Sequence, residues 1–406
     1  MASEGLFDDL RIVELSRGAG AAYCAKLFAD LGADVIAVEP PGGSALRRRG
    51  PFAEDTPGLE RSGLFAYLNT SKLGVTLDVA TRRGRLMLDQ LLEGADILVE
   101  DNAPSWMDGA QLDYAHLSKA HPELIVTSIT PFGQDGPWRD YQGNDFIAQH
   151  TSGVAYHNGA RAEDLVAEPP IVLPGYLGEF AGALAAAAGT MCALFERETT
   201  GLGTHVDVAL QDVLAMNQQV DIAWVTYGGR VPSRSATAKP PIPYVGQQPT
   251  ADGFIDVITR TEGQWRTFLQ VLGDPEWAEN ELFKDMNSRS QYWDALEPLV
   301  QQETRRFGKQ DLFRRGQAAG VSTAAVNTVA DAAEAEHFAE RGSFVEMEHS
   351  VLGQTRCPGP PARFAGDVWG IRRPAPLLGE HNREVFCGRS GYSERELVTL
   401  YQAGVV

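Results

Sequence analysis

A single carboxylate, Glu179, stands directly before an uncharged stretch rich in alanine and glycine, residues 180–195. This stretch predicts a helix packed closely against other backbone, and Glu179 falls in its first turn. The field of a helix N-terminus favours the charged form of such a carboxylate. Beside a crevice, the group would be an anionic nucleophile or base. The alternative that the pattern leaves open is that Glu179 simply caps the helix.

Three adjacent arginines, Arg47, Arg48 and Arg49, lie in a turn-rich loop at residues 40–51. Guanidinium groups bind phosphates through paired hydrogen bonds, so this loop is a candidate phosphate site. Lys72, which precedes a strand-like run, is a candidate for a further phosphate contact. The alternative for each of these cations is a charge in a solvated loop.

A second loop, residues 131–137, has the sequence PFGQDGP and follows a predicted strand. Gly133 and Gly136 allow backbone to approach a substrate closely, and free N–H groups around Gln134 would stabilise an oxyanion. The same residues are also ordinary turn formers. The loop is therefore a candidate for contact with the reacting group of a substrate.

A glycine pair, Gly18 and Gly20, is compatible with the start of a dinucleotide-binding turn. Glu39 ends the second predicted strand, where a ribose-binding acid would stand. The third glycine position holds Tyr23, and a bulky side chain there would prevent close packing of helix on strand. A nicotinamide-dependent dehydrogenase is therefore only an alternative hypothesis.

Strands and helices alternate in the N-terminal part of the chain. The predicted strands are residues 11–15, 34–39, 96–99 and 124–129, and the predicted helices are residues 19–31, 82–92 and 114–120. This alternation predicts an α/β fold, a Rossmann-like, doubly wound parallel sheet with a ligand crevice at the carboxyl ends of its strands. The candidate loops follow such strand ends, so we expect them to border that crevice.

The composition changes near residue 225, and prolines gather between residues 232 and 243. A strand at residues 254–259 and amphipathic helices follow, which predicts a small α+β domain. We therefore expect a large Rossmann-like domain at residues 1–224 and a linker with the small domain at residues 225–330. Residues 331–406 are then a return segment that completes the large domain.

The 406-residue chain has a formal net charge of −19, which argues against nucleic acid or an anionic membrane as a partner. Its four cysteines and eight histidines show no metal-ligand spacing, so no metal site is expected. Reduced thiols and an N-terminus without a secretory signal predict a cytoplasmic protein. The uncharged run after Glu179 is roughly fifteen residues, whereas a membrane span needs about 20.

Long co-linear blocks of the chain resemble the family III CoA-transferases, the group that includes formyl-CoA transferase, carnitine CoA-transferase and α-methylacyl-CoA racemase. The blocks are LRIVELS, LFADLGADVIAVEPPGG, ITPFGQDGPW, ERETTGLGTHVDVALQD, GVSTAAVN and APLLGEHNREV. The resemblance runs almost from end to end. It implies a Rossmann-like large domain, a small domain and a homodimer of interlocked subunits.

The resemblance also implies an enzyme that moves CoA from an acyl-CoA thioester to a free carboxylic acid. CoA is then a substrate, and no tightly bound cofactor is expected. The family's catalytic aspartate falls on Glu179, which carries the same functional group on a longer side chain. In the family, this carboxylate attacks the acyl-CoA carbonyl to form a mixed anhydride, and the returning thiolate gives an enzyme–CoA thioester. The acceptor carboxylate then completes the exchange.

The site residues are expected from these patterns and the resemblance together. Those expected to bind CoA are Arg47, Arg48, Lys72, Asn102 and Pro104, and those expected near the substrate are Gly133, Gln134, Gly136, Asn144 and Asp145. Ala103 replaces the arginine of the family's ENFRPG block, so one contact is expected to be missing. The racemase branch needs a histidine base where Asn144 stands. Alternatives with less support are a non-catalytic acyl-CoA-binding homologue and a racemase.

Overall fold

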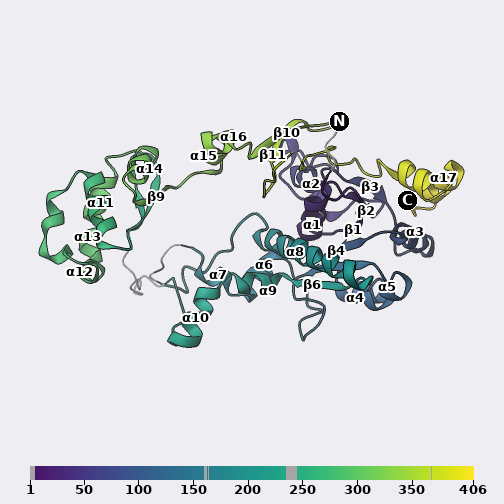
Figure 1. The fold of residues 1–406 in the computed structure, drawn as a ribbon, viewed down its shortest axis with the longest axis horizontal. Coiled ribbons are helices and arrows are strands. Elements are labelled where there is room, and N and C mark those ends of the chain that lie inside the picture. The colour runs from purple at the N-terminus through teal and green to yellow at the C-terminus, as the bar shows by residue number, and fades with distance from the viewer. Residues whose placement is uncertain (1–4, 160–161, 163, 235–244, 367) are drawn as a thin grey trace. The chain divides into compact units, whose positions relative to one another are not determined.

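The computed structural model describes residues 5–159, 162, 164–234, 245–366 and 368–406. The chain divides into two compact units (Figure 1). Unit 1 comprises residues 1–160, 165–234 and 343–406, and unit 2 comprises residues 161–164 and 235–342. The main segment of unit 2, residues 235–342, begins and ends later in the chain than the expected segment 225–330. Pro240, Pro241 and Pro243 of the expected connection lie outside the described residues.

A six-stranded parallel sheet forms the centre of unit 1. Its strands are β1 (Arg11–Leu15), β2 (Asp34–Glu39), β3 (Leu73–Thr76), β4 (Ile97–Glu100), β5 (Ile125–Thr130) and β6 (His205–Ala209), in the order β3-β2-β1-β4-β5-β6. Every residue of β3, β4 and β5 is buried, as parallel strands covered on both faces require. The predicted doubly wound α/β sheet is confirmed, and its order reverses between β1 and β4.

The connections between these strands are helical. The helices of unit 1 are α1 (Ala19–Ala29), α2 (Gly63–Leu68), α3 (Arg82–Leu92), α4 (Pro104–Gly109), α5 (Tyr114–Ala120), α6 (Asp145–Thr151), α7 (Val154–His157), α8 (Leu177–Thr200), α9 (Leu210–Met216), α10 (Gln219–Gly228) and α17 (Glu394–Gln402). The antiparallel pair β10 (Phe344–His349) and β11 (Gly353–Pro358) and the π-helix η5 (Arg383–Arg389) complete the unit. The predicted helices 82–92 and 114–120 coincide with α3 and α5.

Helix α8 has 24 residues and extends beyond the uncharged run 180–195 at both ends, with Glu179 in its first turn as predicted. It ends at Thr200, and Gly201 caps it with φ 69°. By length and hydropathy alone it would be able to cross a membrane. In unit 1, however, one face of α8 is buried, and this face includes Gly182, Ala183 and Ala186. A Cβ on Gly182 would lie only 2.3 Å from the Leu210 side chain. The small residues of α8 therefore permit close packing inside the α/β layers.

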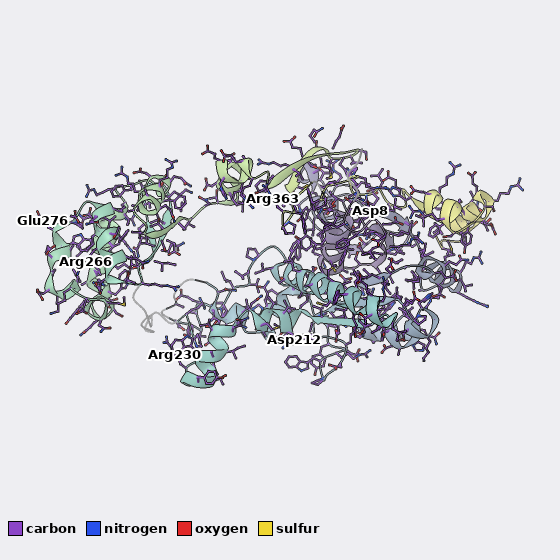
Figure 2. All side chains as sticks on the ribbon, viewed as in Figure 1. Asp8, Asp212, Arg230, Arg266, Glu276 and Arg363 are labelled. Carbon is purple, nitrogen blue, oxygen red and sulfur yellow. The ribbon has the colours of Figure 1, made fainter. Side chains whose placement is uncertain are left out.

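Unit 2 contains a three-stranded antiparallel sheet and several helices. Its strands are β7 (Gly246–Pro249), β8 (Phe254–Ile258) and β9 (Ser322–Ala325), and its helices are α11 (Glu262–Leu272), α12 (Met286–Gln291), α13 (Trp293–Thr304), α14 (Lys309–Ala318), α15 (Val329–Glu334) and α16 (Glu336–Glu340). Phe268, Leu296 and Leu312 belong to its own hydrophobic core. Polar side chains such as Arg266 and Glu276 are exposed (Figure 2). This arrangement corresponds to the predicted small α+β unit.

Candidate active site

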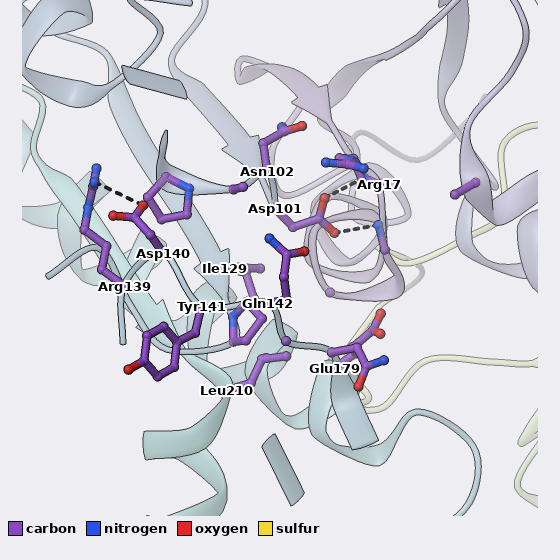
Figure 3. Close-up of a pocket in the computed structure, with 18 of the residues that line it drawn as sticks. Arg17, Asp101, Asn102, Ile129, Arg139, Asp140, Tyr141, Gln142, Glu179 and Leu210 are labelled. Atoms are coloured by element: carbon purple, nitrogen blue, oxygen red, sulfur yellow. Dashed lines mark hydrogen bonds and ion pairs between the residues drawn. The ribbon is translucent and has the colours of Figure 1, made fainter. Parts of the chain in front are cut away.

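A cavity of about 280 Å³ opens in unit 1 where the sheet order reverses (Figure 3). Loops after β1, β4 and β5 and the first turns of α8 and α9 line it. The lining includes Arg17, Gly18, Arg49, Asp101, Asn102, Pro104, Arg139, Asn144 and Glu179. The carboxyl ends of parallel strands meet at such a reversal, which is the usual place for a ligand in an open α/β sheet. The predicted crevice therefore contains Glu179.

Glu179 lies in the first turn of α8, but its carboxylate does not cap its own helix. Its Oε2 accepts the backbone N–H of Ala19, the first residue of α1, at 2.5 Å. The N–H of Glu179 donates instead to Asp145 Oδ1 at 3.1 Å, so Asp145 supplies a side-chain acceptor to α8. The start of α1 therefore holds the Glu179 carboxylate at the cavity wall.

Burial governs the electrostatics of Glu179, which is 7% exposed. Burial raises the pKa of its carboxyl group, whereas the Arg49 guanidinium and the Ala19 N–H lower this pKa. The nearby charge of Asp145 adds to the increase. The sequence pattern predicted that a helix N-terminus would favour the charged form, and here desolvation outweighs that effect. The Glu179 carboxylate is therefore charged only above a raised pKa.

Arg49 brings positive charge to this carboxylate. Its Nη1 lies 3.6 Å from Glu179 Oε1, too far for a hydrogen bond, and Nη1 is buried without a hydrogen-bond partner among the described residues. The guanidinium also stands 5.4 Å from the ring centroid of Tyr176. Tyr176 precedes α8 with a left-handed backbone (φ 58°), a strained conformation that is often found at functional sites. Arg49 therefore offers a free donor beside Glu179.

A second carboxylate, Asp101, lies at the same helix start. It follows β4, and it accepts the N–H groups of Arg17 at 2.5 Å and of Gly18 at 2.8 Å. Burial raises the pKa of Asp101 to about 6, with a contribution from the charge of Glu179. A Cβ on Gly18 would lie 3.0 Å from both Asp101 Oδ2 and Glu179 Oε2. Gly18 thus leaves room for two carboxylates, and the sequence pattern did not single out Asp101.

Two residues expected to bind phosphate, Arg47 and Lys72, form buried ion pairs within unit 1. Arg47 is fully buried, and its guanidinium pairs with Glu39 at 2.8 Å and with Glu60 at 2.6 Å. Lys72 is also fully buried, and its Nζ lies 2.7 Å from Glu14. A buried charge is tolerated only when it is paired. Both cations therefore neutralise carboxylates inside the protein and do not face the cavity.

The other residues expected to bind CoA have different positions. Arg48 is exposed, and its guanidinium donates to the carbonyl groups of residues 42–44. Asn102 and Pro104 line the cavity. Asn102 Nδ2 donates to the Leu15 carbonyl at 3.0 Å and so joins the ends of β4 and β1. Contacts of these three residues with CoA stay predictions.

The glycine loop at residues 131–137 borders the cavity, but not through its glycines. The N–H of Gly133 donates to Thr130 Oγ1 at 2.9 Å, and the N–H of Gln134 donates to Asp207 Oδ2 at 2.9 Å. These two donors are therefore engaged within the protein. Pro131 and residues 139–143 line the cavity, whereas Gly133, Gln134 and Gly136 are not part of its lining.

Asn144 and Asp145 lie at the start of α6. Asn144 lines the cavity, and its side chain accepts the N–H of Ile147 at 3.1 Å as the helix N-cap. Asp145 also accepts a hydrogen bond from Gln149 at 2.7 Å. No histidine belongs to the cavity lining in the described part of the chain. The geometry therefore lacks the histidine base of the racemase branch.

The geometry also opposes the dehydrogenase hypothesis. Glu39, the expected ribose ligand, is already paired with Arg47 and accepts the N–H of Ser44 at 2.9 Å. A dinucleotide would place its pyrophosphate at the start of α1. Asp101 and Glu179 occupy that position, and their charges would repel a phosphate.

Comparisons with known proteins identify the relatives of this chain. The chain matches the profile of CoA-transferase family III over residues 7–382. It is 31% identical, over 98% of both chains, to succinyl-CoA:(R)-benzylsuccinate CoA-transferase subunit BbsE from Thauera aromatica. It is 28% identical, over 98% of both chains, to succinyl-CoA–D-citramalate CoA-transferase from Chloroflexus aurantiacus. A solved CAIB/BAIF family protein from Brucella suis superposes with a TM-score of 0.83 at 28% identity, covering 95% of this chain and 100% of that chain.

Proposed function

The chain belongs to CoA-transferase family III, and from this premise we propose that Glu179 is the nucleophile through which it moves CoA from an acyl-CoA thioester to a carboxylic acid. One observation carries this proposal. The Glu179 carboxylate lies in the cavity where the sheet order reverses, held by the Ala19 N–H and faced by the Arg49 guanidinium. A carboxylate can accept and return an acyl group without any other reagent.

In the first half-reaction, a Glu179 carboxylate oxygen attacks the thioester carbonyl carbon. The C–S bond breaks, CoA leaves as its thiolate, and a mixed anhydride joins Glu179 to the donor acyl group. The thiolate then attacks the glutamyl carbonyl carbon, and the donor leaves as a free carboxylate. Glu179 now carries CoA as a thioester, so the activation of the donor is conserved.

In the second half-reaction, the acceptor carboxylate attacks the glutamyl thioester, and the thiolate leaves again. The thiolate then attacks the acyl carbon of the acceptor, which releases the acceptor's CoA ester and the free Glu179 carboxylate. Each attack places negative charge on a carbonyl oxygen. Arg49, whose Nη1 has no hydrogen-bond partner among the described residues, is the proposed donor to that charge.

We propose succinyl-CoA as the donor and a dicarboxylic acid as the acceptor. Both curated relatives described above are named for succinyl-CoA. Arg17 lines the cavity, and no ion pair of its guanidinium occurs within the described residues. A distal carboxylate of the acyl group would pair with this cation. The exposed Arg48 is the proposed contact for a CoA phosphate.

The first test is to trap the enzyme-bound intermediate. The protein is incubated separately with succinyl-CoA and with uncharged acyl-CoAs of similar length, quenched with hydroxylamine, and mapped by peptide mass spectrometry. We expect a hydroxamate on Glu179, formed most rapidly with succinyl-CoA. No modification by any donor, despite measurable CoA binding, would support a non-catalytic acyl-CoA-binding protein instead.

Two variants of Glu179 test separately the negative charge and the length of its side chain. Glu179→Gln removes the nucleophile, and turnover is expected to fall to background while CoA binding is retained. Glu179→Asp keeps the carboxylate but shortens the side chain that reaches Ala19, and a misplacement of about 1 Å costs about 100-fold in rate. Equal rates for the wild type and Glu179→Gln would contradict the proposed nucleophile.

We further propose that the two compact units are the large and small domains of a homodimeric, cytoplasmic subunit. The exposed apolar side chains of α10 support the dimer, and the four free cysteines support a reducing compartment. One relative is named as a subunit, so a second kind of chain is the competing arrangement. Native mass spectrometry of the purified protein, alone and from its source lysate, distinguishes the two.

A further inference from the structure

We infer that Asp101 is a positioning residue that acts through Glu179, because it fixes the start of α1 against Glu179 and favours the uncharged, CoA-bound form of that side chain. This inference rests on the proposed role of Glu179 as the nucleophile. Asp101 itself has no assigned role in the transfer reaction. It follows β4 and lines the same cavity as Glu179 (Figure 3). A Cβ on Gly18 would lie 3.0 Å from an oxygen of each of these two carboxylates.

The hydrogen bonds of Asp101 define its positioning role. Its Oδ1 accepts the N–H of Arg17, and its Oδ2 accepts the N–H of Gly18 and, at 3.5 Å, that of Ala21. The next donor of the same turn, the N–H of Ala19, is then left for Glu179 Oε2. One helix start is thus divided between two carboxylates. Without Asp101, the turn that directs the Ala19 N–H toward Glu179 loses the hydrogen bonds that hold it in place.

The charges that face Glu179 come from four elements. Arg49, from the loop after η1 (Ala45–Arg48), and the N–H groups at the start of α1 favour the charged carboxylate. Asp145, at the start of α6, and Asp101, after β4, oppose it. The pKa of Asp101 is about 6, so Asp101 is charged at pH 8.

The covalent step removes one of these like charges. Glu179 carboxylate and an acyl-CoA become the Glu179–CoA thioester and a free carboxylate, so one negative charge leaves the site with the released acid. Repulsion between Asp101 and Glu179 exists in the free enzyme and disappears in the thioester. Asp101 therefore shifts the equilibrium of the half-reaction toward the covalent intermediate.

The experiment measures this equilibrium directly. Wild-type and Asp101→Asn proteins are incubated at pH 8 with fixed concentrations of succinyl-CoA and succinate until the ratio of CoA-bound to free protein is constant. Intact-protein mass spectrometry then gives this ratio. We expect about a tenfold lower ratio for Asp101→Asn, because a nearby charge commonly changes the equilibrium of a carboxyl group by at least this factor. Asp108→Asn is the control, since Asp108 is exposed, lies outside the cavity lining and pairs with Arg139, and its ratio should equal that of the wild type.

The positioning role has a separate readout. Asp101→Ala removes all acceptors for the turn, and the rate of thioester formation is expected to fall by about 100-fold. An unchanged ratio for Asp101→Asn at equilibrium would overturn the electrostatic role, and an unchanged rate for a folded Asp101→Ala protein would overturn the positioning role. If Asp101→Ala does not fold, the ratio of CoA-bound to free protein for Asp101→Asn still tests the electrostatic role of Asp101. A wild-type protein without any adduct on Glu179 would instead refute the proposed function.

Discussion

At the scale of single residues, the site depends on how a buried carboxylate is kept reactive. Burial raises the pKa of Glu179, and a protonated carboxyl group cannot attack a thioester. Arg49 and the Ala19 N–H oppose this effect by stabilising the anion. The reactivity of Glu179 is therefore the result of opposing interactions, each of which can be changed separately.

The pH dependence of acylation tests this balance. Because the pKa of Glu179 is raised, the rate of acylation should decrease on the acid side at a higher pH than an exposed glutamate would give. Arg49→Met removes the largest opposing interaction, so the acid limb should move to still higher pH. Single-turnover rates at saturating acyl-CoA, measured from pH 4 to 9, report this limb independently of CoA affinity. An acid limb that stays in place in Arg49→Met would show that Arg49 does not stabilise the anion.

Glu100 provides a test of stability at the same scale. It is fully buried, and burial raises its pKa from the ordinary 4.5 to about 7. Between these values the folded protein holds a proton that the unfolded chain has lost, so stability should fall as pH rises and stay low above about 7. The change from 4.5 to about 7 corresponds to about 3 kcal/mol.

Glu100→Gln should remove this pH-dependent loss. Its free energy of unfolding, measured with urea at pH 5 and pH 8, is expected to decrease less between the two values than that of the wild type. Glu123→Gln, a change of the same kind at an exposed position, should behave as the wild type does. Parallel pH dependences for the wild type and Glu100→Gln would mean that Glu100 keeps an ordinary titration in the folded state.

At the scale of elements, buried ion pairs hold together segments that are distant in the chain. Lys72, directly before β3, binds Glu14 of β1 and the Ala22 carbonyl of α1. Arg47 joins Glu39 at the end of β2 to the Pro376 carbonyl near the C-terminus. These contacts fix the strand ends from which the cavity loops emerge. The cations that resemble phosphate ligands in the sequence are therefore part of the scaffold.

Variants of Lys72 test the scaffold role against phosphate binding. Lys72→Met leaves Glu14 as a buried unpaired charge, and the free energy of unfolding should decrease by about 3–5 kcal/mol. Adding Glu14→Gln removes that charge and should restore most of the stability. Urea denaturation measures both changes. The double variant should also keep the KM of the wild type for acyl-CoA. A large increase in KM in a stable double variant would show that Lys72 contributes to CoA binding.

At the scale of the whole molecule, unit 1 presents an apolar surface that its own residues do not cover. No residue of α10 is buried, although Ile222 is 51% exposed, Trp224 42% and Tyr227 89%. Exposed apolar surface of this extent often marks an interface with another protein. This surface is the structural support for the proposed homodimer.

Trp224→Glu is expected to weaken self-association, because it places a charge in the centre of this apolar surface. Analytical ultracentrifugation over a range of concentrations should show at least a tenfold increase in the dissociation constant. Val398→Glu, at an exposed apolar position of α17, is the matched control and should associate as the wild type does. Unchanged self-association of Trp224→Glu would place the interface elsewhere.

The sequence by itself determined the elements and the central residue of the site. The alternation of side chains in a strand and the glycines at the ends of helices are local properties of the sequence. The predicted strands at residues 11–15 and 34–39 therefore coincide with β1 and β2. Glu179 was recognisable because a lone charge before a long uncharged helix is also a local pattern. The family blocks extend along the whole chain and therefore predicted the activity class correctly.

Only the tertiary structure decided what each charge does. Arg47, Arg48 and Arg49 are neighbours in sequence, but they are buried in an ion pair, exposed on the surface and directed at Glu179, respectively. Asp101 and Glu179 are 78 positions apart in the chain, but both accept N–H groups at the start of α1, where β4 lies beside β1. The partner of a charge depends on long-range packing and desolvation, which residue types and local spacing do not encode.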